Sequence, residues 1–234
     1  MEFNEKFLTE LNNRNMNLTE DKIEKFHIYM KLLLEWNEKI NLTAITEEDE
    51  VITKHFIDSL TISKYIKDTD RIIDIGTGAG FPGIPLKIER DNNEIVLMDS
   101  LNKRIKYLED VIDKLELKNI TAIHGRAEEF GIKEEYREKF DIATARAVAN
   151  LPVLLEYCLP FVKVGGYFLC MKGPEVEEEV NMAKKALEVL GGKIEKIEIP
   201  FEDIRHSIII IKKVASTPKR YPRNAGKIKK EAIG

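Results

Sequence analysis

Hydrophobic residues in the first 65 positions recur at the spacing of helices. A helix is predicted from Thr19 to Glu38, where apolar residues follow one another every three or four positions. The preceding Asn17-Leu18-Thr19-Glu20 is a variant of the capping box that begins helices. A second helical pattern runs from Asp49 to Tyr65. We therefore expect residues 1–66 to form an N-terminal helical cap packed on the rest of the chain.

From Arg71 onward, the pattern changes to short apolar runs separated by helical stretches. Strands are predicted at Ile72–Ile75, Ile95–Met98, Ile120–Ile123, Asp141–Ala143 and Tyr167–Met171. Helices are predicted between them at Ile84–Arg90, Leu101–Leu115, Leu151–Phe161 and Glu175–Leu190. This alternation is typical of an α/β protein with a mostly parallel, Rossmann-like sheet.

The end of the chain departs from this alternation. After Gly191-Gly192, the runs Ile194–Ile199 and Ser207–Ile211 predict an antiparallel pair at the far end of the sheet. We assign residues 67–214 to the sheet domain and residues 215–234 to a basic C-terminal tail.

Length and composition narrow the class of protein. The 234 residues exceed the usual domain of ~100–200 residues, so we expect one domain with additions, and 43% hydrophobic residues exclude wholesale disorder. Cys158 and Cys170 are the two cysteines, without a CxxC motif, which predicts a reducing, cytoplasmic location and no structural zinc. The sequence shows no signal peptide and no run of ~18 apolar residues, so we expect no membrane segment.

Charge is distributed unevenly along the chain. The formal net charge is −4, yet the stretch from Lys212 to the end has eight basic residues against Glu231 alone. Basic side chains there could neutralise RNA phosphates, and an aromatic ring could stack on a base. The RNA-binding candidates are Lys219, Arg220, Tyr221, Arg223 and Lys227. The alternative is a disordered tail that only aids solubility.

A glycine-rich turn follows the first predicted strand and precedes a helix. It begins at Asp74 and contains Gly76, Gly78 and Gly80, which let a ligand approach the backbone closely. Gly78 to Gly83 also satisfies GxGxxG, so a nicotinamide enzyme and a merely structural turn remain alternatives. The carboxylate of Asp74 would repel a pyrophosphate but suits a ligand with a cationic amino-acid end. The DxGxGxG pattern therefore favours the S-adenosylmethionine of class I methyltransferases.

Further candidate residues follow the next three strands. Asp99 ends the second strand, where a carboxylate can accept hydrogen bonds from ribose hydroxyls. Ala127 and Glu128 follow the third strand, where the adenine of such a cofactor would lie; a solvated loop is the alternative. Arg146 ends the fourth strand, at the edge of the sheet where ligands bind, although a surface ion pair is also possible.

Several segments carry a close resemblance to a known family. They are Trp36–Thr43, Lys54–Leu60, the glycine turn through Leu86, Asp99–Arg104, Thr144–Ala149 and Thr217–Arg223. Together they resemble the bacterial ribosomal RNA small-subunit methyltransferase G family, also called glucose-inhibited division protein B, which makes 7-methylguanosine in 16S rRNA.

The resemblance implies a cofactor, a substrate and several contacts. It implies that S-adenosylmethionine is bound by Gly76, Phe81, Ala127, Glu128 and Arg146, in agreement with the glycine turn. The implied partner is 16S rRNA, which we expect to be methylated within a 30S subunit or its assembly intermediate. For His55, Asp58 and Ser59, packing roles and roles at the border of the cleft both remain open.

The chemistry of guanine N7 sets what such an enzyme needs. This atom carries no proton at neutral pH, so we expect a positioning mechanism without a general base, a catalytic residue or a metal; orientation alone can contribute ~7–11 kcal/mol. A non-enzymatic RNA-binding or assembly protein, a nicotinamide-dependent oxidoreductase and a small-molecule methyltransferase remain alternatives. No heptad pattern demands a partner chain, and we expect a monomer.

Overall fold

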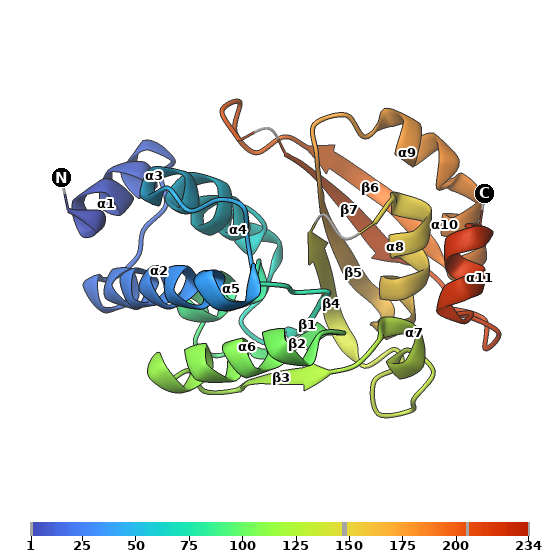
Figure 1. The fold of residues 1–234 in the computed structure, drawn as a ribbon. Coiled ribbons are helices and arrows are strands. Elements are labelled where there is room, and N and C mark those ends of the chain that lie inside the picture. The colour runs from blue at the N-terminus through green and yellow to red at the C-terminus, as the bar shows by residue number, and fades with distance from the viewer. Residues whose placement is uncertain (1, 147–148, 205, 234) are drawn as a thin grey trace.

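A seven-stranded sheet forms the centre of the computed structural model, which describes residues 2–146, 149–204 and 206–233 (Figure 1). Its strands are β1 (Arg71–Ile75), β2 (Glu94–Asp99), β3 (Ile120–His124), β4 (Phe140–Arg146), β5 (Val162–Lys172), β6 (Gly192–Glu198) and β7 (Ser207–Lys213). Their order is β3-β2-β1-β4-β5-β7-β6; β1 to β5 pair in parallel, and β7 is antiparallel to β5 and β6. The predicted fold class is confirmed.

Helices follow most strands of the sheet. They are α5 (Gly83–Glu89), α6 (Asn102–Lys114), α7 (Ala127–Phe130), α8 (Leu151–Cys158), α9 (Glu177–Met182), α10 (Lys184–Leu190) and α11 (Ala225–Lys230). Two predicted helices differ from the structure. The helix predicted from Glu175 to Leu190 is divided at Ala183, and α8 passes into a 3-10 turn at Leu159–Phe161, where Pro160 lacks the N–H that an α-helix needs.

The N-terminal helices form the cap, residues 2–66. They are α1 (Phe3–Asn13), α2 (Glu20–Ile40), α3 (Glu48–Val51), a π-helical turn (Ile52–Ile57), α4 (Asp58–Leu60) and a 3-10 turn (Ser63–Tyr65). The predicted capping box is wrong, because Thr19 is the N-cap residue of α2 and its side chain makes no capping hydrogen bond. Among the described residues, no helix is both long and apolar enough to cross a membrane.

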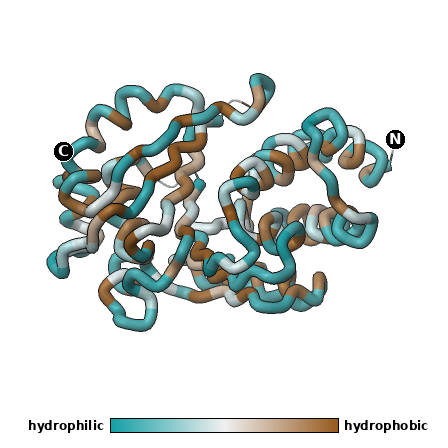
Figure 2. Tube along the Cα trace, turned by 180° about the vertical axis from the view of Figure 1, so that it is seen from behind, coloured by the Kyte–Doolittle hydropathy of each residue, from teal (hydrophilic) through white to brown (hydrophobic). Residues whose placement is uncertain are grey.

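The sheet separates two apolar cores. On one face, Phe26 and Phe56 of the cap pack in the same core as Ile72 of β1. On the other face, Ile73 packs with residues of α8 and α10, because successive side chains of a strand point to opposite faces. Figure 2 shows hydrophobic residues concentrated along the central strands and hydrophilic residues in the peripheral loops. Both cores leave the carboxyl ends of the parallel strands free for a site.

Candidate functional site

The glycine turn is held from both sides by backbone and cap. The N–H groups of Gly76 and Thr77 donate to the carbonyl oxygen of Met98 at 2.9 and 3.1 Å, which ties the turn to the end of β2. Behind the turn, the hydroxyl of Tyr29 in α2 donates to the carbonyl oxygen of Ala79 at 2.6 Å. Gly80 has a φ of +95°, and a Cβ there would lie 2.8 Å from the Tyr29 oxygen, so this position requires glycine.

Asp74 lies beneath the turn and is completely buried. Its Oδ2 accepts hydrogen bonds from the Thr77 hydroxyl at 2.6 Å and from the N–H of Gly83 at 3.0 Å. Its Oδ1 has no hydrogen-bond partner among the described residues. Burial disfavours the charged form and raises the pKa of Asp74 to about 6. Asp74 thus organises the turn and keeps one carboxylate oxygen unpaired.

Asp99 ends β2 and faces the turn. Its Oδ2 accepts from the N–H of Gly78 at 3.0 Å and from Nη1 of Arg104 at 3.2 Å, and its Oδ1 accepts from the N–H of Leu101 at 2.9 Å. A carboxylate offers about four lone-pair positions, so about one remains for a ligand hydroxyl.

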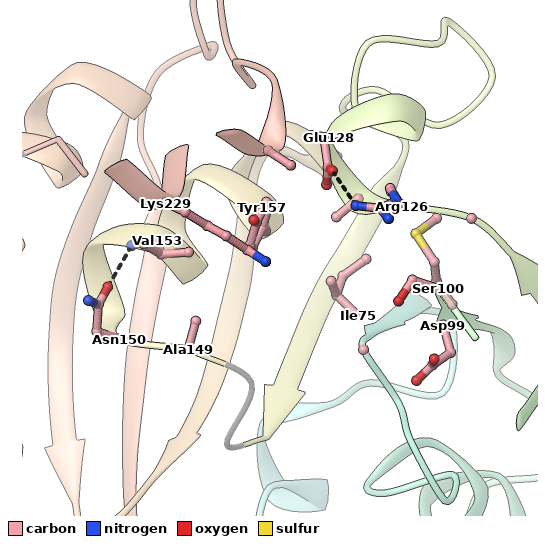
Figure 3. Close-up of a pocket in the computed structure, with 15 residues that line it drawn as sticks. Ile75, Asp99, Ser100, Arg126, Glu128, Ala149, Asn150, Val153, Tyr157 and Lys229 are labelled. Carbon is pink, nitrogen blue, oxygen red and sulfur yellow. Dashed lines mark hydrogen bonds and ion pairs between the residues drawn. The ribbon is translucent and has the colours of Figure 1, made fainter. Parts of the chain in front are cut away.

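Two cavities meet at Asp99 and form one cleft at the carboxyl ends of the strands. The turn cavity, about 420 Å³, lies between the glycine turn and the cap and is bordered by Thr43, His55 and Arg146. The loop cavity, about 400 Å³, lies between the loop after β3 and helix α8 (Figure 3). Both cavities are lined by Gly76, Asp99 and Ser100, and the cleft lies where the strand order reverses beside β1.

The cleft brings together seven of the nine predicted cofactor-binding residues. The turn cavity is lined by Gly76, Gly78, Phe81, Asp99 and Arg146. The loop cavity is lined by Gly76, Asp99, Ala127 and Glu128. Asp74 and Gly80 lie behind the turn and line neither cavity. Sequence reasoning missed the lining residues Tyr157 in α8 and Lys229 in α11, because only the tertiary fold brings them to the loops.

Arg146 is fixed by three acceptors from the cap. Its Nη1 donates to the carbonyl oxygen of Lys54 and to Oδ2 of Asp58, both at 3.0 Å, and its Nη2 lies 3.1 Å from Nδ1 of His55. The guanidinium carbon lies 4.8 Å from the centre of the Phe81 ring. Because Asp58 is completely buried, this ion pair is not the surface pair considered as an alternative. Ala147 and Val148, which follow Arg146 in the sequence, lie outside the described residues.

His55 joins the cap to the same cluster. Its ring stacks on Phe81 with the ring centres 4.4 Å apart, and its Nε2 lies 2.9 Å from the Thr43 hydroxyl. Burial and the charge of Arg146 lower the pKa of His55 to about 3, so the imidazole is neutral at pH 7. We assign the proton to Nε2, which donates to Thr43, because Nδ1 accepts from Arg146. Asp58 also accepts from Nδ1 of His206 at 2.9 Å.

The basic end of the chain packs on the sheet domain as the C-terminal arm, residues 217–233. Arg223 pairs with the buried Glu156, with Nη2 and Oε2 2.7 Å apart. Tyr221 is half-buried, and the Arg220 guanidinium lies 5.1 Å from its ring centre. Lys219, Arg220 and Lys227 are exposed. The arm is thus an ordered part of the fold, which argues against a disordered tail.

Comparison with known proteins places this geometry in a family. The family model described as rRNA small subunit methyltransferase G matches residues 22–208. The ribosomal RNA small subunit methyltransferase G of Acetivibrio thermocellus is 56% identical, over 93% of this chain and 91% of that protein. The protein of the same name from Clostridium botulinum strain Loch Maree is 52% identical over 100% of both chains.

Solved structures of more distant proteins share the fold. A mutant of MtNAS in complex with S-adenosylmethionine has a TM-score of 0.57 at 14% identity and covers 82% of this chain and 75% of its own. The Methanococcus jannaschii fibrillarin pre-rRNA processing protein has a TM-score of 0.51 at 21% identity, over 64% of this chain and 69% of that one. With the family model matching most of its length, the chain belongs to the rRNA small subunit methyltransferase G family.

Proposed function

We propose that this chain transfers a methyl group from S-adenosylmethionine to N7 of a specific guanosine in 16S rRNA. The observation that carries the proposal is the single cleft in which the glycine turn, Asp99 and Arg146 meet. Membership of the methyltransferase family supports the reaction class. The names of the relatives support rRNA of the small subunit as the substrate.

The acidic groups of the cleft fit the two ends of S-adenosylmethionine. Glu128 in the loop cavity can accept a hydrogen bond from the adenine amino group, and Asp99 can accept one from a ribose hydroxyl. The unpaired Oδ1 of Asp74 places negative charge beneath the turn, which favours a cationic amino group above it. The turn cavity therefore suits the methionine end and the loop cavity suits the adenosine end.

Positioning is the main task of the protein in this reaction. S-adenosylmethionine supplies an electrophilic methyl group on a sulfonium, and guanine N7 offers a lone pair without a proton, so no general base is needed. The chain must hold N7 in line with the methyl group. Orientation of this kind can lower the reaction barrier by ~7–11 kcal/mol. Phe81, His55 and Arg146 form a packed wall suited to this purpose.

The charge of Arg146 needs compensation, because positive charge develops on the guanine as the methyl group is transferred. The buried carboxylate of Asp58 lies 3.0 Å from Arg146 and supplies that compensation. Three of the five Arg146 N–H groups have partners among the described residues, which leaves two to bind the cofactor, guanine O6 or a phosphate.

RNA binding is assigned to exposed basic residues outside the cleft. Lys219, Arg220 and Lys227 can neutralise phosphates, and Tyr221 and Arg223 hold this surface in place. A target base within folded rRNA must be unpaired or extruded to enter the cleft, so a 30S subunit or its assembly intermediate is the expected substrate.

The test is methyl transfer from labelled S-adenosylmethionine to 16S rRNA and to 30S subunits from a strain that lacks the enzyme. Nucleoside digestion and mass spectrometry should then find the label in 7-methylguanosine. Cofactor binding without any label in RNA would favour the RNA-binding or assembly protein. Binding of NADH in place of S-adenosylmethionine would favour the oxidoreductase.

Arg146→Lys tests the positioning role. A lysine keeps the charge but cannot reach all three acceptors at once, so kcat/KM for methyl transfer should fall at least about tenfold. Arg71→Lys is the matched control, because Arg71 pairs with Glu94 on the surface at the opposite end of β1. Full activity of Arg146→Lys would contradict a specific role for the guanidinium.

A further inference from the structure

Helix α11 in the C-terminal arm contributes to the loop cavity. Ala225 and Lys229 line this cavity and lie four residues apart, which places them on one face of the helix. Figure 3 shows the Lys229 side chain extending past Tyr157 toward the cavity, whose other side carries Ser100 and Arg126. A segment far from the glycine turn in sequence therefore forms part of the same cleft.

The position of α11 is built into the fold by several contacts. Arg223 anchors its start, since its backbone N–H and its side chain both donate to the buried Glu156, at 2.8 and 2.7 Å. The Asn224 side chain caps the helix by accepting from the N–H of Lys227 at 3.0 Å. Ile228 is completely buried. Arg137 ties down the preceding segment by donating to the carbonyl oxygen of Tyr221 at 2.8 Å.

We propose that α11 is a wall of the adenosine half of the cofactor cleft and that Lys229 is a cofactor-binding residue. This inference rests on the proposed function, which places adenosine in the loop cavity. The ammonium group has three donors and no acceptor, so it is suited to the ring nitrogens of adenine, which are acceptors. Glu128 in the same cavity provides the acceptor that the adenine amino group requires. Lys229 and Glu128 therefore complement the two kinds of polar group on one adenine edge.

The placement of Lys229 favours the cofactor over an RNA phosphate. Of the three lysines in α11, Lys229 is the one that lines the loop cavity. All three lysines are exposed, but Lys227 and Lys230 lie at other angular positions around the helix. The Arg126 guanidinium lies 3.9 Å from Glu128, so the charges facing Lys229 are not all positive.

The experiment compares Lys229→Met with Lys230→Met, since both variants keep an apolar stem and remove one charge from the same helix. Calorimetric titration with S-adenosylmethionine should give a Kd five- to tenfold weaker (roughly one hydrogen bond) for Lys229→Met and within about twofold of the wild type for Lys230→Met. In methyl transfer, Lys229→Met should raise KM for S-adenosylmethionine and leave kcat unchanged.

A second variant tests the wall without changing charge. Ala225→Met places a larger side chain on the face of α11 that lines the cavity, so it should also weaken S-adenosylmethionine binding while RNA affinity remains at the wild-type value. Thermal unfolding of each variant checks that the fold is intact.

Two outcomes would overturn the proposal. One is wild-type affinity for S-adenosylmethionine in both folded variants, Lys229→Met and Ala225→Met. The other is reduced affinity of Lys229→Met for 16S rRNA with its cofactor affinity unchanged, which would make Lys229 a phosphate contact. A different result would contradict the proposed function. If the wild type binds S-adenosylmethionine but labels no rRNA, rRNA is not the substrate, and the measured affinities still test whether α11 is a wall of the cofactor cleft.

Discussion

The cap and the C-terminal arm each complete one end of the cleft, but they attach to the sheet in different ways. The cap is joined through an apolar core in which the ring of Phe81, in the turn after β1, lies 5.5 Å from Tyr29 and 6.1 Å from Phe56, measured between ring centres. The arm buries Ile228 and is also held by polar contacts that include the Arg223–Glu156 pair and Arg137 on backbone carbonyls.

This difference predicts how the attachment of the cap and the attachment of the arm respond to substitutions. The stability that comes from apolar packing is distributed over many contacts, so the stability lost on substitution scales with the side-chain volume removed. A buried ion pair is concentrated in two groups, and removal of one partner leaves an uncompensated charge. The cap end should therefore respond to the size of a side chain, whereas the arm end should respond to charge balance.

The largest effect is expected from Phe56→Ala in the cap. Phe56 is completely buried and contacts several other rings, so its truncation should lower the free energy of unfolding by about 4 kcal/mol, measured by urea denaturation. Phe56→Leu fills most of the space and should cost only about 1 to 1.5 kcal/mol. Equal costs for the two variants would show that volume does not govern this attachment.

A somewhat smaller effect is expected from Arg223→Met in the arm. The carboxylate of Glu156 would remain buried without its partner, so the free energy of unfolding should fall by about 3 kcal/mol. The double variant with Glu156→Met should recover at least half of that loss, which a double-mutant cycle measures. Arg71→Met is the control, because it breaks an exposed pair and should cost less than about 1 kcal/mol. Without recovery in the double variant, charge balance would not be the cause.

The smallest effect concerns pH and belongs to the cap. The pKa of His55 is about 3 in the folded protein against an ordinary value of 6.5, so the unfolded chain binds the proton more tightly. The stability that this residue contributes is therefore present above pH 6.5 and is lost as pH falls from 6.5 toward 3. Between pH 7 and pH 5 the loss should be about 2 kcal/mol.

His55→Gln isolates this contribution, because groups such as Asp74 titrate in both proteins and cancel in the comparison. The wild type should lose about 2 kcal/mol more than His55→Gln between pH 7 and pH 5, as measured by urea denaturation at each pH. Parallel pH dependence of the two proteins would place the acid sensitivity elsewhere.

The sequence predicted the sheet well because most of its strands contain short apolar runs, which can be recognised without knowledge of distant contacts. Each of the seven strands was expected, although β5 begins at Val162, five residues before its predicted start at Tyr167. Helix α1 was not distinguished within the cap, although Phe3, Phe7 and Leu11 lie on one face. No proline or glycine in α9 or α10 signals the break between these helices at Ala183.

The lining of the cleft was predictable where residues follow a strand end in the sequence. Phe81, Asp99 and Arg146 line the cleft because the parallel sheet carries strand ends to one edge, and their binding of a cofactor stays a prediction. Thr43 and Lys229 reach the cleft only through tertiary packing of the cap and the arm. Arg223 was predicted as an RNA contact, and no local signal revealed that Glu156, 67 residues away, would pair with it.

The cleft takes side chains from Leu42 near one end of the chain and from Lys229 near the other. During synthesis the chain emerges from its N-terminus, and units fold as they appear. The cap and the glycine turn can therefore assemble while α11 is still unmade. A nascent chain would therefore form the turn cavity, which Arg146 completes, before Lys229 completes the loop cavity.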